Sequence, residues 1–194
     1  KKGERMAISI ALMGAGGKMG GRITRNIKDL PDYRVMYVEV SEAARAAMTS
    51  NGIEATPQEE ALAKAEVVIL ALPDRFIGKI THDIVPKMKP GAMVMSLDPA
   101  AAHAGVIPLR QELSYFVTHP CHTSLFNDET TEAARSDWFG GVDAKQHIVC
   151  ALHQGHESDY AKGEQIAKHI YAPVLESHRV TVEQMAILEP ALAE

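Results

Sequence analysis

The feature that most constrains the fold is a glycine-rich turn near the start of the chain. An apolar run from Ile8 to Met13 leads directly into the turn Gly14-Ala-Gly-Gly-Lys-Met-Gly20. Apolar residues then recur at the spacing of one helix face, at Met19, Ile23, Ile27 and Leu30. The sequence therefore predicts a strand, a tight turn and a helix.

The glycine spacing indicates a dinucleotide site. Gly14, Gly17 and Gly20 stand where such a turn needs a sharp exit from the strand, close backbone approach to a pyrophosphate, and close helix-to-sheet packing. The amide groups at the helix N-terminus then stabilise the anion. The predicted cofactor-binding segment comprises Gly14, Ala15, Gly16, Gly17, Lys18, Met19 and Gly20.

An acidic residue follows the second predicted strand, at Glu39. A carboxylate there hydrogen-bonds ribose hydroxyls and repels a 2′-phosphate, which favours NAD over NADP. Arg45, one turn along the next helix, leaves NADP as an alternative cofactor. We expect the strand-end loop of Leu72, Pro73 and Asp74 to line the cofactor site as well. Two alternatives are a turn without a ligand and a methyltransferase, whose cofactor also uses a glycine turn.

Strand and helix patterns alternate along the chain, which predicts a doubly wound, Rossmann-type α/β fold with a mostly parallel sheet. Further strands are expected at 35–40, near 53, and at 67–72, 93–97, 115–118, 147–152 and 174–177. Helices are expected at 42–50, from the capping box Thr56-Pro-Gln-Glu59, over 76–85, at 158–170, and from a second box at Thr181. Residues 127–141 read as a polar loop.

Composition excludes several classes of protein. The net charge of −5 argues against a basic surface that would bind nucleic acid. No apolar run approaches the length of a membrane span. Cys121 and Cys150 are too few for a disulfide framework and are expected to be reduced thiols. No signal peptide pattern precedes the glycine turn, so we expect a soluble cytoplasmic protein.

Together, four motifs resemble a known group: the glycine turn, Ala71-Leu-Pro-Asp74, His119-Pro-Cys-His122 and Ile187-Leu-Glu-Pro190. The chain resembles the phosphogluconate dehydrogenase-like oxidoreductases and, within them, the D-apionate oxidoisomerases. The last two motifs, with Leu125-Phe-Asn-Asp-Glu129, carry the narrower resemblance. It implies NAD-linked oxidation of a branched sugar acid coupled to rearrangement of its carbon skeleton.

The resemblance also implies a helical C-terminal domain that builds a dimer. We therefore expect residues 1–180 to form the NAD-binding domain and residues 181–194 to be the first helix of a truncated helical domain. The expected partners are a small sugar acid and a second copy of the chain, bound through the missing region.

Candidate reaction residues follow two predicted strands. His119 and His122 come after the strand at 115–118, at the sheet edge where such folds bind ligands, and a histidine there can take the hydroxyl proton as hydride leaves. Each could instead be a loop histidine hydrogen-bonded to the backbone. Asp98, after the strand at 93–97, could orient substrate or cap a turn. The side chains of His82, His147, His156 and His169 are interpreted as surface or structural groups.

Glu189 is the remaining candidate, because it lies in the apolar stripe of the last predicted helix. A carboxylate in such a stripe is paired, protonated or bound to a cation, and Pro190 beside it should kink or interrupt the helix. His119 and Glu189 could hold a divalent metal such as Zn²⁺ as a Lewis acid for the carbon shift. Alternatively, Glu189 meets a basic residue of the missing domain.

The sequence thus predicts an NAD-dependent oxidoreductase of the oxidoisomerase type, acting on a small polyhydroxy acid. Two other functions stay open at this point. One is a hydroxyacid or phosphogluconate-type dehydrogenase without a carbon shift. The other is an NAD-binding regulator without catalysis.

Overall fold

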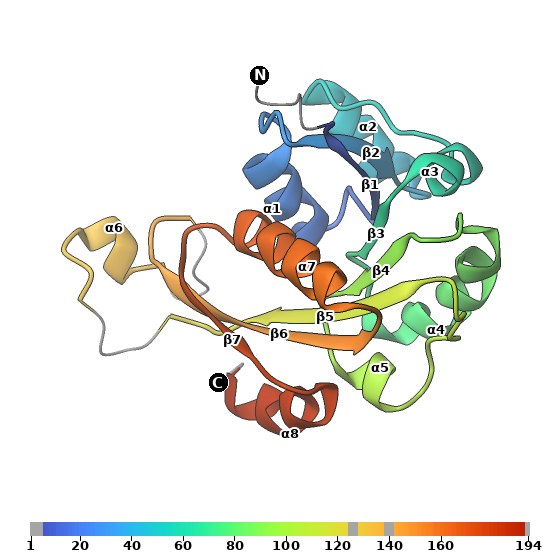
Figure 1. The fold of residues 1–194 in the computed structure, drawn as a ribbon. Coiled ribbons are helices and arrows are strands. Elements are labelled where there is room, and N and C mark those ends of the chain that lie inside the picture. The colour runs from blue at the N-terminus through green and yellow to red at the C-terminus, as the bar shows by residue number, and fades with distance from the viewer. Residues whose placement is uncertain (1–5, 124–127, 138–141, 193–194) are drawn as a thin grey trace, which may run out of the picture.

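The protein is described by a computed structural model that covers residues 6–123, 128–137 and 142–192 (Figure 1). Seven strands form a sheet, namely β1 (Ile8–Met13), β2 (Tyr33–Val38), β3 (Val67–Leu70), β4 (Met93–Ser96), β5 (Ser114–Pro120), β6 (Gln146–Gln154) and β7 (Val174–Arg179). The helices are α1 (Lys18–Ile27), α2 (Glu42–Ser50), α3 (Gln58–Lys64), α4 (Asp74–Ile84) with the 3₁₀ turn η1 (Val85–Lys87), α5 (Ala100–His103), α6 (Glu132–Arg135), α7 (Glu157–Ile170) and α8 (Val182–Leu192).

The sheet has the order β2-β1-β3-β4-β5-β6-β7, and its first five strands in this order run parallel. β6 is antiparallel to β5, and β7 is parallel to β6. The predicted doubly wound, mostly parallel sheet is therefore confirmed. The chain adds β2 on one side of β1 and β3 on the other, so the strand order reverses at β1. Ligands of open α/β sheets bind at the carboxyl ends of the strands beside such a reversal.

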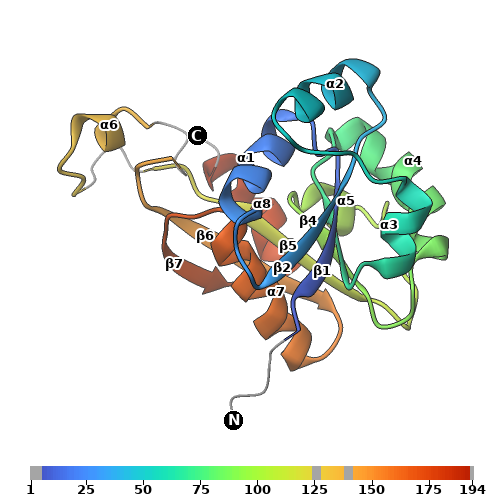
Figure 2. The same ribbon diagram turned by 90° about the horizontal axis from the view of Figure 1, so that it is seen from above.

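Helices cover both faces of the sheet (Figures 1 and 2). One face packs against α1, α2 and α7, and its core includes Ile23, Phe116 and Ile166. The other face packs against α3, α4, α5 and α8, and its core includes Ile77 and Met185. Within the described ranges, no helix combines the length and apolar composition that crossing a bilayer demands.

The expected capping box at Thr56 does not form. The Thr56 N–H donates to the carbonyl oxygen of Tyr37 at 2.7 Å, so Thr56 stays extended beside β2. α3 consequently begins at Gln58, with Pro57 as its N-cap and no side-chain cap. The strand expected near residue 53 is reduced to a single bridge between Tyr37 and Ala55.

The second half of the chain differs from expectation in two further ways. The segment read as a polar loop contains the short helix α6, whose N-cap Thr131 accepts the N–H of Ala134 at 3.2 Å. β5 extends to Pro120, so His119 lies inside the strand rather than after it.

α7 lies directly on β5 because Gly163 faces the ring of Phe116. A Cβ atom on Gly163 would stand 2.5–2.7 Å from three ring atoms of Phe116, whose side chain is fully buried. The glycine therefore sets how closely this helix approaches the sheet.

We expect Gly163→Ala to lower the free energy of unfolding by about 1–3 kcal/mol, because the buried ring has no room to move aside. Gly21→Ala is the matched control: Gly21 also lies in a helix, and its Cβ would have no neighbour within 4 Å. This variant should keep or raise stability by up to about 1 kcal/mol, since alanine favours the helix. Urea denaturation of both variants checks the prediction, and equal stabilities would contradict it.

Candidate active site

A cavity of about 350 Å³ opens at the carboxyl edge of the sheet, between the loops that follow β1 and β3. Its lining consists of Gly17, Lys18, Met19, Leu70, Ala71, Leu72, Pro73, Asp74, Ile77, Leu97, Asp98 and His119. The structure thus brings together eight of the candidate residues, from four separate segments: Gly17, Lys18, Met19, Leu72, Pro73, Asp74, Asp98 and His119.

The glycine turn is packed tightly against its neighbours. Gly14 has a φ angle of +74°, and a Cβ there would collide with the carbonyl oxygen of Ala71. A Cβ on Gly20 would collide with the carbonyl oxygens of Gly14 and Ala15. Only glycine fits at either position. The glycine turn therefore packs directly against the residues after β3, and both segments line the cavity.

The N-terminus of α1 is prepared for an anion. Gly17 is its N-cap and provides no side-chain cap, and the first turn of this fully described helix contains no acidic residue. The first amide groups of a helix lack partners within the helix and carry its positive dipole end. A phosphate group placed here would meet these amides, as the glycine spacing predicts.

Glu39 reaches back to the glycine turn. Its carboxylate accepts the Gly16 N–H at 3.0 Å, and its second oxygen accepts the N–H groups of Val40 and Ser41 at 2.8 and 2.9 Å. These bonds fix the carboxylate at the end of β2, where a ribose of a bound dinucleotide would lie. Arg45 is exposed on α2.

Asp98 both lines the cavity and caps a turn. Its Oδ1 accepts the Ala100 N–H at 2.7 Å at the start of α5, while its own carbonyl oxygen accepts the Ser96 hydroxyl at 2.8 Å. Burial raises the pKa of Asp98 above its ordinary value, and the charge of Asp74 raises it further. The Ala100 N–H and His119 oppose this rise without cancelling it.

His119 is the penultimate residue of β5 and is half-buried. Its neighbour Thr118 donates its hydroxyl to the Val149 carbonyl on the α7 side of the sheet, so His119 projects to the opposite face and into the cavity. His122 lies two residues beyond the strand and is not among the cavity-lining residues. Cys121 lies between these two histidines in the sequence, and Cys150 is buried in β6. Both cysteines are free thiols, as expected.

Glu189 lies on α8, at a position whose side chain falls outside the described part of the structure. The predicted capping box of this helix is confirmed: Thr181 donates its N–H to Gln184 at 2.9 Å and accepts that of Gln184 at 3.1 Å. α8 continues through Pro190 to Leu192, so of the two expected effects of Pro190 the interruption is wrong, and the kink stays a prediction.

Sequence reasoning missed three apolar residues of the cavity wall, Leu70, Ile77 and Leu97. A signal for these residues existed. Leu70 ends the buried strand β3 and Leu97 directly follows the buried strand β4, and a ligand is expected at this edge of the sheet.

Two family models match the chain. That of the acetohydroxy acid isomeroreductase NADPH-binding domain matches residues 6–124, and that of the phosphogluconate dehydrogenase (decarboxylating) C-terminal region matches residues 127–194. A D-apionate oxidoisomerase of Rhizobium rhizogenes is 59% identical over 186 residues, which cover 95% of this chain and 67% of that protein. A D-apionate oxidoisomerase of Cupriavidus necator is 54% identical over 190 residues, with 97% and 68% covered.

Among solved structures, a semialdehyde dehydrogenase NAD-binding protein from Cupriavidus necator, in complex with calcium and NAD, superposes with a TM-score of 0.92. It is 54% identical, and the match covers 97% of this chain and 68% of that one. The chain thus spans about two thirds of the length of these relatives.

We expect Asp98→Asn to make the protein more stable than the wild type at neutral pH. A carboxyl group with a raised pKa binds its proton more tightly in the folded state, so stability falls as pH rises through the window above the ordinary aspartate value of about 3.9. Asparagine carries no such cost and can still accept the Ala100 N–H. The advantage should vanish below that window in thermal melts from pH 3 to 8.

Asp83→Asn is the control with the opposite sign. Hydrogen bonds from Lys87 and Gln58 hold the pKa of the exposed Asp83 below its ordinary value. Its replacement should therefore lower stability at neutral pH, if it has any effect. An Asp98→Asn variant whose stability relative to the wild type did not change with pH would contradict the prediction.

Proposed function

Because the chain belongs to the D-apionate oxidoisomerase family of NAD-dependent oxidoreductases, we propose that it oxidises a branched sugar acid with NAD and rearranges its carbon skeleton. The observation that carries this proposal is the cavity itself. A histidine and a carboxylic acid face the glycine turn across a mostly apolar space at the strand reversal, as dehydrogenation of an alcohol beside a nicotinamide requires.

The residues present fit a dinucleotide. The turn Gly14–Gly20 leaves no room for a side chain where Gly14 and Gly20 approach their neighbours, and the amides of α1 face the place for the pyrophosphate. Glu39 would bind the adenosine ribose, and Leu72, Pro73 and Asp74 would line the nicotinamide ribose. When bound, NAD accepts the hydride that the oxidised carbon loses.

We assign His119 as the residue that accepts the proton of the substrate hydroxyl group. As the carbon gives up its hydride, the O–H bond of the same carbon must break, and the imidazole accepts that proton. Asp98 lies on the same cavity wall, and burial raises its pKa, so it is protonated more readily than an exposed aspartate and in that form can donate a hydrogen bond to a substrate oxygen. His122, two residues beyond β5, stays a predicted substrate-contacting residue.

The carbon shift calls for a Lewis acid, and we propose that His119 and Glu189 would bind a divalent cation such as Zn²⁺ for this purpose. An imidazole that ligates an ion has no lone pair left for the hydroxyl proton, so proton acceptance and metal binding are alternative roles for His119. Support comes from the packing of α8 against α5 and β5. α5 begins two residues after Asp98, and β5 contains His119. Glu189 is in the helix that this packing brings to the substrate side of the sheet.

Replacement of His119 tests the assignment. In His119→Ala, we expect kcat for NADH formation from a branched sugar acid to fall by about 10²–10⁴-fold, because the proton acceptor is lost. The Kd for NAD should stay unchanged, and the bound divalent metal measured by elemental analysis should decrease. His82→Ala is the control, since His82 is an exposed histidine of α4 that bonds its own helix at Gly78.

The product decides between this function and its alternatives. An oxidoisomerase returns a rearranged skeleton, visible by ¹³C NMR, whereas an unrearranged keto acid would favour a simple dehydrogenase. NAD binding without NADH formation across a panel of sugar acids would favour a regulator. Equal metal content in the wild type and His119→Ala would remove His119 from the metal site.

Cofactor choice is tested at Glu39. We expect Glu39→Arg to shift the preference from NAD toward NADP by about tenfold or more, because it replaces a carboxylate that repels the 2′-phosphate with a group that pairs with it. The ratio of kcat/KM values for the two cofactors measures this shift. Glu42→Arg, which adds the same charge at the exposed start of α2, is the control, and an equal shift in both variants would refute the ribose assignment.

A further inference from the structure

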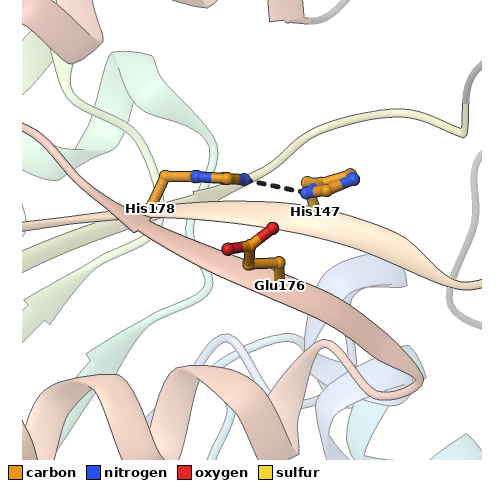
Figure 3. Close-up of side chains that lie close together, drawn as sticks. All are labelled: His147, Glu176 and His178. Carbon is orange, nitrogen blue, oxygen red and sulfur yellow. Dashed lines mark hydrogen bonds between the residues drawn. The ribbon is translucent and has the colours of Figure 1, made fainter.

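A second group of chemically active side chains lies on the two outer strands of the sheet, away from the cavity. His147 projects from β6, and Glu176 and His178 project from β7. Each offers one metal-ligating atom, and these three atoms lie within 4.8 Å of one another. Figure 3 shows the two imidazole rings meeting edge to edge with the Glu176 carboxylate beside them. All three are accessible from solvent, with His147 half-buried.

The backbone explains why these side chains converge. β6 and β7 are parallel, but the register shifts between Gln146, which pairs with Val174, and Ile148, which pairs with Ser177. β7 therefore carries one extra residue opposite His147. Such bulges re-aim side chains, and many occur beside functional sites.

The direction of each side chain follows from its neighbours in the strand. Ser177 Oγ contacts Cys150 Sγ at 3.5 Å on the α7 side of the sheet, and Ile148 belongs to the core on that same side. Because side chains alternate along a strand, Glu176, His178 and His147 all project to the opposite face. The cluster thus comes from the register, although its residues lie 29 or more positions apart across the two strands.

The histidine pair already shares one hydrogen. His147 Nδ1 and His178 Nε2 are 2.8 Å apart, and the rings are nearly parallel at 24° with centroids 5.0 Å apart. One nitrogen of this contact must carry a proton and the other a lone pair. Replacing that proton by a cation would let both nitrogens act as ligands, with the Glu176 carboxylate as a third.

The size of the cluster suits a small transition-metal ion. Zinc binds imidazole nitrogen at about 2.0–2.1 Å, which separates two tetrahedral ligands by about 3.3 Å. The two ring nitrogens would need to move apart by about half an ångström, which side chains at the surface allow. Two nitrogen ligands favour zinc, nickel or cobalt over calcium and magnesium, which prefer oxygen.

We propose that His147, Glu176 and His178 form a divalent transition-metal site, with Zn²⁺ as its ion and water completing the coordination. The ion would fasten edge strand β7 to β6, just before the chain enters α8. The segment between β7 and α8 is also attached to β6, since the Val180 N–H donates to the Cys150 carbonyl oxygen at 2.9 Å. An ion at the proposed site would therefore strengthen the connection between β6 and the start of α8.

The proposed site is separate from His119. In the sheet, His119 pairs with Val149, and Val149 pairs with His178, so one strand lies between the two histidines. The strand spacing puts their backbones about 10 Å apart on the same face. His119 is not among the residues whose ligating atoms converge at the outer strands, so the two sites can be tested independently.

Zinc titration by isothermal calorimetry of the apo protein tests the proposal. We expect His178→Ala to bind zinc about tenfold or more weakly at this site, since even loss of a group that only supports a ligand costs 10–100-fold. Glu176→Gln preserves size and should weaken binding in the same direction. His82→Ala, which removes an exposed histidine elsewhere, should match the wild type.

His119→Ala separates this site from the proposed catalytic metal. If both sites exist, His119→Ala loses one ion and keeps the one at the outer strands, whereas His178→Ala does the reverse. Retention of NADH formation in His178→Ala would leave the proposed function intact whatever happens to its zinc.

Thermal stability supplies a second measurement. A ligand that binds only the folded state raises the melting temperature, so saturating zinc should stabilise the wild type and His82→Ala more than Glu176→Gln or His178→Ala. Circular dichroism without zinc establishes that each variant is folded. Wild-type zinc affinity in folded Glu176→Gln and His178→Ala would overturn the proposal.

Discussion

The close contact between the glycine turn and the end of β3 is the constraint on which the site depends. Gly14 leaves space for the carbonyl oxygen of Ala71, and Gly20 leaves space for the carbonyls of Gly14 and Ala15. Without these gaps, β1 and α1 could not approach β3 so closely. The cavity wall is assembled by this contact, because its lining runs from the turn directly into the loop after β3.

Local sequence signals predicted elements well where nothing distant competed with them. The Thr181 capping box formed as expected, because its partner Gln184 is local and the preceding strand ends at Arg179. The Thr56 box has the same pattern and failed, because the Thr56 N–H bonds to Tyr37 in a neighbouring strand. A capping pattern in the sequence cannot reveal a bridge to a strand that precedes it by many residues.

The same distinction applies to the site. The candidates in the cavity were predictable because each lies near the carboxyl end of a parallel strand or in the segment that directly follows it, and parallel strands bring these ends to one edge. The outer cluster was not predictable, and His147 was interpreted as a surface or structural group. Its approach to His178 depends on antiparallel β6 and on a one-residue register shift in β7, neither of which has a clear signal in the sequence. Glu189 remains a prediction, since periodicity places it on a helix without fixing its contacts.

The charges of the cavity impose an order on the proposed chemistry. Asp74, Asp98 and His119 share a wall with Lys18, and the pKa of Asp98 is raised because its negative charge is poorly solvated beside Asp74. A cation bound beside Asp98 would lower that pKa again, since an opposite charge favours the carboxylate. The pKa of Asp98 would therefore be lower when an oxidised, positively charged nicotinamide is present than when the cavity is empty. The positive ring would also offset the negative charges of Asp74 and Asp98, so the repulsion of a substrate carboxylate would be smaller after the ring is bound than before.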